Sequence, residues 1–410
     1  MSGQRVGTPL RGEGGHAVIR LKILQVVEAA ATGVGRHVLD LTEGLLRRGH
    51  SVHLVYSPTR GDAMFAERLQ RLPGVGYSAV RMRSAPNPAD LGAMQAIRRV
   101  MAKFGPFDVV HCHSSKAGFV ARIAACGSGS RVVYSPHAIY TMSPGLTKVT
   151  RLIYRTAEIA LAQLTDRIIA VSRAEFDECR AIGIPARRLA LVPNTVSRHD
   201  SLPRDAARHR LGLDPEEVAV AFVGRLTLQK GIDRMLAAFV ALPPATPARL
   251  VVIGDGALAT AAHTQAEALG IAPRVLWLGA TPAEPLLRAF DLFAMPSRYE
   301  AASYSLLEAM AAGLPVVATA TGSACDLIAD GENGFKVPVE DTAGFAQRLA
   351  ELVTNPARLR AMADEAARPR RETSGEESMV NDILDVYGSI IAVSPSVSRA
   401  EPAMPTGRSG

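Results

Sequence analysis

The sequence contains few cysteines and few aromatic residues. Only four of its 410 residues are cysteines, and aromatic residues make up 5 %. The cysteines are scattered and form no Cys-x-x-Cys pair, so they support neither a disulfide framework nor a structural zinc site. Their positions are Cys112, Cys126, Cys179 and Cys325. This usage is typical of a reducing compartment, and we expect a cytoplasmic protein.

The sequence also lacks a long uninterrupted apolar segment. Its most apolar stretch, 301–320, contains Glu308, Gly313 and Pro315. A membrane-spanning helix needs about 20 mostly apolar residues, and a charge inside it is costly. Residues 1–16 are rich in Gly and Arg and have no apolar core, unlike a signal peptide. We therefore expect neither a membrane span nor a signal peptide.

Charge of one sign is concentrated in the first half of the chain. The formal net charge is +7, but residues 1–200 hold 27 Lys/Arg against 14 Asp/Glu, and residues 201–410 hold 19 against 25. A half-chain at +13 can face nucleic acid, anionic lipid or an anionic ligand, or serve only solubility. No zinc finger, aromatic RNA-binding motif or basic heptad region is present, so we expect no nucleic-acid partner.

Short apolar runs alternate with helical segments along most of the chain. In the first half the predicted strands are 22–28, 51–56, 107–113, 131–135, 167–172 and 189–193. In the second half they are 218–225, 249–256, 274–279, 292–297 and 314–319. Nearly continuous apolar strands that alternate with helices are typical of parallel, doubly wound sheets. The sequence therefore predicts an α/β protein with two Rossmann-like domains that face each other across a cleft.

Composition divides the chain into segments. We expect a first domain over 19–194, a polar linker over 195–216 and a second domain over 217–375, with an amphipathic helix over 376–392. The two ends, 1–18 and 393–410, are rich in Gly, Ser and Pro or Arg, and we expect both to be disordered.

The chemistry is expected in loops after the strands, because ligands bind beyond the carboxyl ends of open parallel sheets. The first such loop contains Gly33 and Gly35, which allow close approach to a ligand beside a helix N-terminus. The loop after Phe-Val-Gly at 222–224 carries Arg225 and Lys230. An Arg can grip two oxygens and a Lys adds a point charge, so this pair suits a diphosphate.

The most distinctive pattern is a pair of glutamates eight residues apart, Glu300 and Glu308. We expect Ser303 to cap a helix that ends at Gly313, which places Glu308 about one turn inside the helix. A carboxylate there can accept two vicinal hydroxyls, as on a ribose. Glu300 could hold hydroxyls of a second sugar, and the amides at the start of the helix could hold phosphate.

Histidines follow two first-domain strands. His137 comes just after 131–135, His113 is the last residue of 107–113, and Ser114 and Lys116 follow it, so we place all four at the cleft. His111 and His113 flank a cysteine, but no further metal ligands are evident, and we expect no metal site.

One motif resembles a nicotinamide-binding fingerprint. Residues 254–259 match Gly-x-Gly-x-x-Ala between a strand and a helix. The acidic residue that should close the following strand is absent, because that strand ends in Gly279 and Ala280. The fingerprint is incomplete, and we expect no dinucleotide cofactor.

Together these motifs resemble the GT-B glycosyltransferases of family 4. The similarity rests on the Glu300 and Glu308 pair with the following run 309–319, on Arg225 and Lys230 in their glycine-flanked loop, and on Val-Pro-Asn before the linker. It extends from about Leu21 to Ile391. The runs 35–50 and 109–122 resemble bacterial enzymes of exopolysaccharide or O-antigen assembly.

The resemblance implies a retaining transferase without a metal or other cofactor. Its donor would be a UDP- or GDP-sugar in the second domain, and its acceptor would lie in the first. Arg225 and Lys230 would hold the diphosphate, Glu308 the ribose, and Glu300 and His137 the donor sugar near the reacting carbon. The remaining donor contacts would come from Gly33, Gly35, Ser303, Tyr304, Ser305 and Leu306.

The resemblance further implies the setting of the reaction. The acceptor would be a lipid-linked or growing saccharide, and the basic first half would contact an anionic membrane peripherally at its cytoplasmic face. The last helix would cross back onto the first domain. Many relatives carry Gly-Phe-Gly where this chain has Ala301, Ala302 and Ser303, which puts the shape of the sugar pocket in question. Two alternatives stay open: a nucleotide-sugar epimerase and a non-catalytic binding relative.

Overall fold

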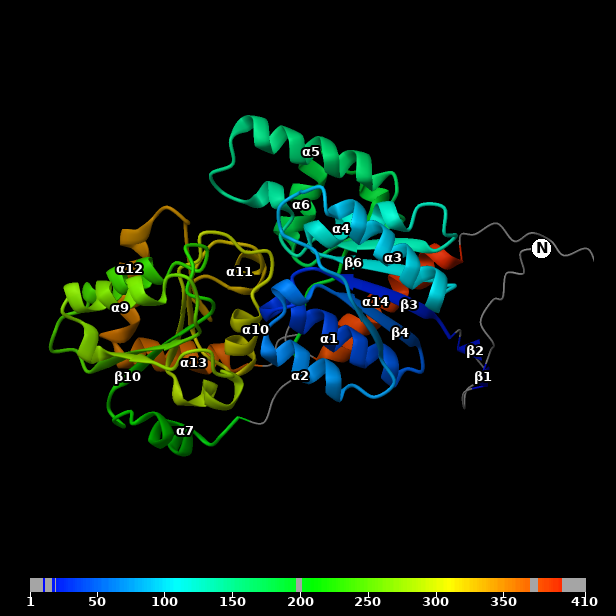
Figure 1. Ribbon diagram of the computed structural model, residues 1–410. Coiled ribbons are helices and arrows are strands. Elements are labelled where there is room, and N and C mark those ends of the chain that lie inside the picture. Colours follow the sequence, from blue (N-terminus) through cyan, green and yellow to red (C-terminus); the bar gives the residue numbers. More distant parts are fainter. Residues whose placement is uncertain (1–9, 12–16, 19, 197–200, 369–374, 393–410) are drawn as a thin grey trace, which may run out of the picture.

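The protein consists of two α/β domains that lie side by side (Figure 1). The structure, a computed structural model, describes residues 10–11, 17–18, 20–196, 201–368 and 375–392. The expected disordered tail 393–410 lies outside the described residues, as does most of 1–18. Within that stretch, β1 (Leu10–Arg11) pairs antiparallel with β2 (Ala17–Val18). Every described helix is too short or too polar to cross a bilayer.

The first domain is built on a seven-stranded parallel sheet in the order β5-β4-β3-β6-β7-β8-β9. Its strands are β3 Lys22–Val27, β4 Ser51–Tyr56, β5 Gly76–Ala79, β6 Val109–His113, β7 Arg131–Ser135, β8 Arg167–Ala170 and β9 Leu189–Leu191. Successive residues of β3 pack on opposite faces, since Ile23 contacts one apolar cluster and Leu24 another. A sheet buried on both faces explains why its strands read as continuous apolar runs.

The second domain repeats this plan with six parallel strands in the order β12-β11-β10-β13-β14-β15. The strands are β10 Val218–Val223, β11 Ala248–Ile253, β12 Val275–Trp277, β13 Leu292–Met295, β14 Val316–Thr319 and β15 Gly334–Val337. The predicted doubly wound fold is therefore confirmed. The sequence did not predict β5 and β15, which are short strands at sheet edges.

Helices cover both sheets. The α-helices are α1 Thr32–Arg47, α2 Ala63–Arg71, α3 Asp90–Phe104, α4 Ser115–Ala124, α5 Lys148–Ala162, α6 Arg173–Ala181, α7 Arg204–Leu211, α8 Ile232–Val240, α9 Ala259–Ala268, α10 Tyr304–Ala311, α11 Ser323–Leu327, α12 Thr342–Val353, α13 Pro356–Ala366 and α14 Glu376–Ile391. Short 3₁₀ helices are η1 Pro58–Arg60, η2 Tyr140–Met142, η3 Ala186–Arg188, η4 Ala272–Arg274 and η5 Glu284–Ala289.

The expected polar linker, 195–216, contains a packed helix. Residues 197–200 lie outside the described residues, but α7 begins at Arg204 and packs on η5. The buried guanidinium of Arg208 donates to the Ala289 carbonyl at 3.0 Å and to Asp291 Oδ2 at 3.2 Å. The polar composition of this segment therefore reflects buried ionic contacts, and residues from 201 onward pack as part of the second domain.

The last helix packs into the first domain, as the resemblance implied. Figure 1 shows α14 beside α1 and β3. Its residues Met379, Val380 and Ile383 are fully buried in one cluster with Leu41 and Leu45 of α1. The close approach of the two helices requires glycine at position 44, since a Cβ there would lie 2.5 Å from Val380 Cγ2.

A pair of glycine substitutions tests this packing. Gly44→Ala places a methyl group against Val380, and overpacking of this kind costs roughly 1–3 kcal/mol. Gly92→Ala on α3 is the matched control, because a Cβ there meets nothing within 4 Å and alanine favours a helix by about 0.5–1 kcal/mol. We expect urea denaturation to show lower stability for Gly44→Ala and slightly higher stability for Gly92→Ala. Equal stability of the two variants would contradict the close helix contact.

Candidate active site

A cleft of about 1180 Å³ separates the two domains and is lined by loops from both. In the first domain these loops include those after β3, β4, β6 and β7, and in the second those after β10, β11, β12 and β13. The strand order reverses between β3 and β6 and again between β10 and β13. Ligands of open α/β sheets bind at such switch points, so the cleft joins two ligand-binding edges.

The cleft wall contains unusual backbone conformations. Among the described non-glycine residues, four have a positive φ: Thr32 (52°), Ser114 (78°), His137 (53°) and Ala138 (85°). All four line the cleft. A side chain in this region is strained, and such strain persists where surrounding contacts enforce it, often at functional sites. The backbone independently marks the cleft as the candidate site.

A buried glutamate of the first domain holds the loop that carries His137. Glu175 Oε1 accepts hydrogen bonds from the backbone N–H groups of Ala138 at 2.7 Å and Ile139 at 3.0 Å, and its Oε2 accepts from Val171 at 3.0 Å. Burial raises the pKa of Glu175, and the three N–H groups oppose that rise. These hydrogen bonds to the carboxyl group thus hold the backbone beside His137 in its left-handed conformation.

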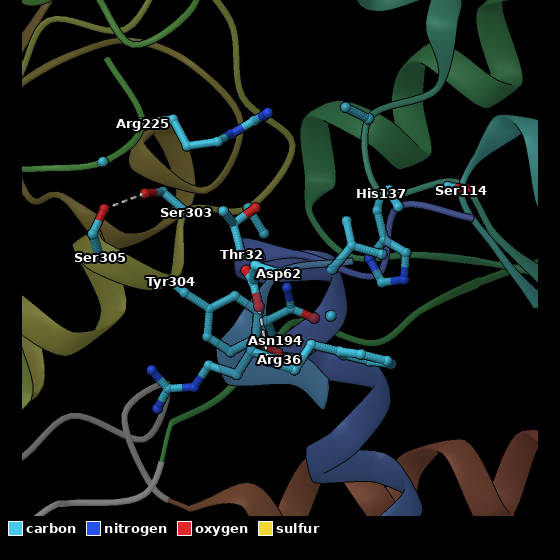
Figure 2. Close-up of a pocket in the computed structure, with 18 of the residues that line it drawn as sticks. Thr32, Arg36, Asp62, Ser114, His137, Asn194, Arg225, Ser303, Tyr304 and Ser305 are labelled. Carbon is cyan, nitrogen blue, oxygen red and sulfur yellow. Dashed lines mark hydrogen bonds between the residues drawn. The ribbon is translucent and has the colours of Figure 1, made fainter. Parts of the chain in front are cut away.

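The loop after β10 brings a cation against a glutamate. Lys230 Nζ lies 2.6 Å from Glu300 Oε1, and the two side chains are 17 % and 6 % exposed. The loop can fold this way because Gly231 starts α8 at φ 74°, where a Cβ would lie 2.2 Å from the Pro296 carbonyl oxygen. Arg225 is exposed on the cleft wall (Figure 2), and no ion pair of its side chain is found among the described residues.

The helix expected after Ser303 is present as α10. Ser303 Oγ accepts from the Leu306 N–H at 3.4 Å and also contacts Ser305 Oγ at 3.0 Å (Figure 2). The helix ends before Gly313, which has φ 79°. Glu308 lies in the second turn and lines the cleft with Ser303 and Ser305. Leu306 does not line it, and its N–H bonds Ser303, so the expected contribution of the Leu306 amide stays a prediction.

An arginine that sequence reasoning missed spans the cleft. Arg36, in the first turns of α1, forms ion pairs with Glu308 Oε1 and, at 2.9 Å, with Glu284 Oε1 of the second domain. Its guanidinium carbon also lies 5.2 Å from the centre of the Tyr304 ring. The carboxylate predicted to bind ribose is therefore already held by a cation from the opposite domain.

Tyr304 brings the two domains into contact beside this arginine. A Cβ at Gly33 would lie 3.3 Å from Tyr304 Cδ2. The Tyr304 hydroxyl lies 3.4 Å from His37 Nδ1, which also contacts Asn194 Oδ1 at 3.0 Å. Gly33 therefore supports interdomain contact, and the ligand approach that we expected of it stays a prediction. Gly35 lines the cleft beside it.

Three histidines gather at the cleft wall, and one of them, His137, lines the cleft. Ring nitrogens of His37, His113 and His137 lie within 4.8 Å of one another, a spacing that could hold a metal ion. His113 Nδ1 lies 3.1 Å from His137 Nε2. Buried His37 Nε2 and His113 Nε2 have no hydrogen-bond partner among the described residues. Sequence spacing did not reveal this trio, because His37 comes from a distant helix.

Desolvation keeps these rings neutral. Burial lowers the pKa of His37 to about 4 and holds the pKa values of His113 and His137 well below the usual range. His111, whose Nδ1 lies 2.7 Å from the Tyr387 hydroxyl on α14, is affected in the same way. The neutral cluster therefore links the C-terminal helix to the histidine that lines the cleft.

The expected acceptor-side residues take different positions. Ser114 and Lys116 line the cleft, but Lys116 Nζ is bound to Asp90 Oδ2 at 2.7 Å and to the Ala85 carbonyl. His113 is fully buried behind His137 and does not line the cleft, so our placement of it there is wrong. Sequence reasoning missed Glu28, which follows β3 and lines the cleft. Burial raises the pKa of Glu28, and the neighbouring Arg60 counteracts part of that rise.

Comparisons with known proteins agree with this architecture. A family model described as Glycosyltransferase Family 4 matches residues 31–199, and one described as Glycosyl transferases group 1 matches residues 203–370. The chain is 32 % identical over 386 residues to D-inositol 3-phosphate glycosyltransferase of Rhodococcus opacus, covering 87 % of this chain and 85 % of that protein.

Solved structures share the fold. Anabaena HepE, in complex with UDP-glucose, matches with a TM-score of 0.77 at 22 % identity, over 90 % of this chain and all of that one. WaaG, a glycosyltransferase involved in lipopolysaccharide biosynthesis, matches with a TM-score of 0.72 at 20 % identity, over 90 % of this chain and 99 % of that one. Both similarities show the arrangement of the two domains.

The neutral histidines predict how stability depends on pH. An unfolded histidine gains a proton near pH 6.5, whereas folded His37 gains one only near pH 4. Between these values the unfolded state binds more protons, so the free energy of unfolding falls as pH is lowered, by about 1.4 kcal/mol per pH unit for each such group. We expect urea denaturation to show a shallower slope for His37→Gln. His263→Gln is the control, because His263 is exposed. The same pH slope of unfolding free energy in His37→Gln as in the wild type would contradict the prediction.

Proposed function

The chain belongs to glycosyltransferase family 4, and from this premise we propose that it transfers a sugar from a nucleotide-sugar donor to an acceptor hydroxyl. The observation that carries the proposal is the charged set on the second-domain side of the cleft. Arg225 and Lys230 lie after β10, and Glu308 lies on the helix after β13. Cations suit the diphosphate, and a carboxylate suits the ribose hydroxyls.

The donor is proposed to be a UDP- or GDP-sugar. The fold match to HepE, a protein solved with UDP-glucose, supports a nucleoside diphosphate as the leaving group. Loss of that group develops negative charge on its phosphate oxygens. Arg225 and Lys230, positioned before the reaction, stabilise that charge at little cost in reorganisation. Their arrangement supports leaving-group stabilisation without a metal, and no Asp-x-Asp pair occurs in the sequence.

The reaction is proposed to retain the anomeric configuration. The bond between the anomeric carbon and the donor phosphate oxygen breaks, and the acceptor hydroxyl oxygen bonds to that carbon on the same face. The acceptor proton passes to the departing phosphate oxygen. Glu300, fixed by Lys230, is proposed to hold the donor sugar during this step.

His137 is proposed to act as a hydrogen-bonding group, without gaining a charge. Its low pKa keeps the imidazole neutral near pH 7. The Glu175 contacts fix the backbone that carries it. These two features support a role in orienting the donor sugar near the reacting carbon.

The acceptor is proposed to lie in the first-domain half of the cleft and to be a lipid-linked or growing saccharide. The net charge of +13 over residues 1–200 supports peripheral attachment to an anionic membrane surface. Glu28, a buried residue that lines this half, offers a carboxyl group to acceptor hydroxyls.

Donor binding can be measured first. We expect one of the UDP-, GDP-, ADP- or TDP-sugars to raise the melting temperature, because a ligand stabilises the state that binds it. EDTA should leave this shift unchanged. Loss of the shift in EDTA would indicate a bound metal ion, for which the three histidines are the candidate ligands.

NMR of the product should show the donor's anomeric configuration. Donor turnover without acceptor would indicate an epimerase, and binding without any turnover a non-catalytic relative.

Removal of Arg225 tests leaving-group stabilisation. We expect Arg225→Ala to lower kcat/KM by about 30- to 1000-fold, because a charged hydrogen bond to the departing phosphate is lost. Arg249→Ala is a suitable control, since Arg249 lies outside the cleft and pairs with Glu217. A rate for Arg225→Ala equal to that of the control would remove Arg225 from the proposed mechanism.

Arg36 is expected to compete with the donor. If Glu308 binds the ribose, the ribose hydroxyls must displace Arg36 from this carboxylate. We therefore expect Arg36→Ala to bind the nucleoside diphosphate about three- to tenfold more tightly than the wild type. This factor corresponds to the free energy of a partly exposed ion pair. Calorimetric titration measures the effect, with Arg60→Ala as the control because the partner of Arg60, Glu28, belongs to the same domain. Weaker binding by Arg36→Ala would contradict this prediction and would mean that Arg36 helps to bind the donor.

A further inference from the structure

Helix α5 exposes an apolar face to solvent. Val149, Leu152 and Ile153 are 68 %, 60 % and 62 % exposed, and Leu164, just past the end of the helix, is 38 % exposed. Positions 149, 152 and 153 follow the i, i+3, i+4 spacing of one helix face. Other exposed large apolar residues in the described chain, such as Leu91, Leu191 and Leu228, lie on separate elements. A concentrated apolar face marks an interaction surface, whereas scattered residues do not.

The same helix is basic. Lys148, Arg151 and Arg155 are exposed on α5. Its one acidic residue, Glu158, is buried and paired with Arg122 at 2.9 Å. Helix α5 therefore presents cations and apolar side chains to solvent and no exposed carboxylate. This combination is typical of helices that lie in the interface of an anionic bilayer. A second copy of the chain would bring the same cations against one another, so charge favours the membrane.

Helix α5 is physically tied to the cleft. The loop 137–147 connects the cleft to the start of α5, and its residues His137 and Tyr140 line the cleft. Arg151 Nη1 donates to the Thr141 carbonyl at 2.5 Å, and the rings of Tyr140 and Tyr154 lie 4.2 Å apart. Figure 1 shows α5 at the outer edge of the first domain. A membrane that contacts α5 would therefore lie beside the loop that carries His137.

We propose that α5 is the membrane-docking element, with Val149, Leu152 and Ile153 inserted among the acyl chains and the neighbouring cations at anionic headgroups. This rests on the proposed function in one respect, since docking at this loop brings a lipid-linked acceptor to the first-domain side of the cleft. The docking surface itself is defined without reference to catalysis.

Sedimentation of the full chain with vesicles tests the proposal. The wild type should sediment with phosphatidylglycerol-rich vesicles at low salt and far less with phosphatidylcholine alone. The triple variant Val149→Ser, Leu152→Ser, Ile153→Ser should partition at least about tenfold less. Leu91→Ser is the matched control, because Leu91 is 67 % exposed on α3. Equal sedimentation of wild type and triple variant overturns the proposal, as does failure of the wild type to bind.

A second measurement reports insertion directly. Trp277 is the only tryptophan of the chain and lies in the second domain. Leu152→Trp adds one on α5, and we expect brominated phosphatidylglycerol vesicles to quench its fluorescence but not that of the wild type. A concentration-dependent dimer that the triple variant abolishes would overturn the proposal in favour of a second copy. The thermal-shift measurement with sugar nucleotides needs no vesicles, so failure of docking and failure of the proposed function are distinguishable.

Discussion

Parallel strand pairing is the constraint on which the rest of this structure depends. It places the carboxyl ends of all strands in a sheet at the same end of that sheet, and these ends of the two sheets face each other here. The residues that carry chemistry come from loops far apart in sequence, yet they meet because each follows a strand. Three further features complete the cleft, namely the cap at Ser303, the left-handed glycine at 231 and the hydrogen bonds of Glu175 to the loop that carries His137.

The fold was largely predictable from sequence. Strands buried on both faces leave continuous apolar runs, so the central strands of both sheets were found, and so was α10 with its capping serine. Two edge strands, β5 and β15, were missed. Strand β5 alternates half-buried and exposed residues, whereas β15 is mostly buried but is only four residues long and begins with a glycine. Helix α7 was missed because its polar residues serve buried contacts to Asp291 and to backbone carbonyls.

The candidate site was predictable only where one loop contains the pattern. Arg225 with Lys230, and Glu300 with Glu308, were found because each pair lies close in the chain. Arg36, Glu175 and the His37 contact with His137 depend on pairings between residues more than 30 positions apart, which no spacing reveals. His113 was misplaced for a related reason: the last residue of a strand points either into the cleft or into the layer beneath it.

The packing of α14 has a consequence for how the protein is made. The first domain buries Met379, Val380, Ile383 and Tyr387 in its own core, against residues of α1 and β3. The ribosome must therefore synthesise the entire second domain before the first domain receives its last core element. Folding cannot proceed domain by domain from the N-terminus, as it does in many two-domain proteins. An exchange of second domains between relatives would likewise have to leave the final helix with the first domain.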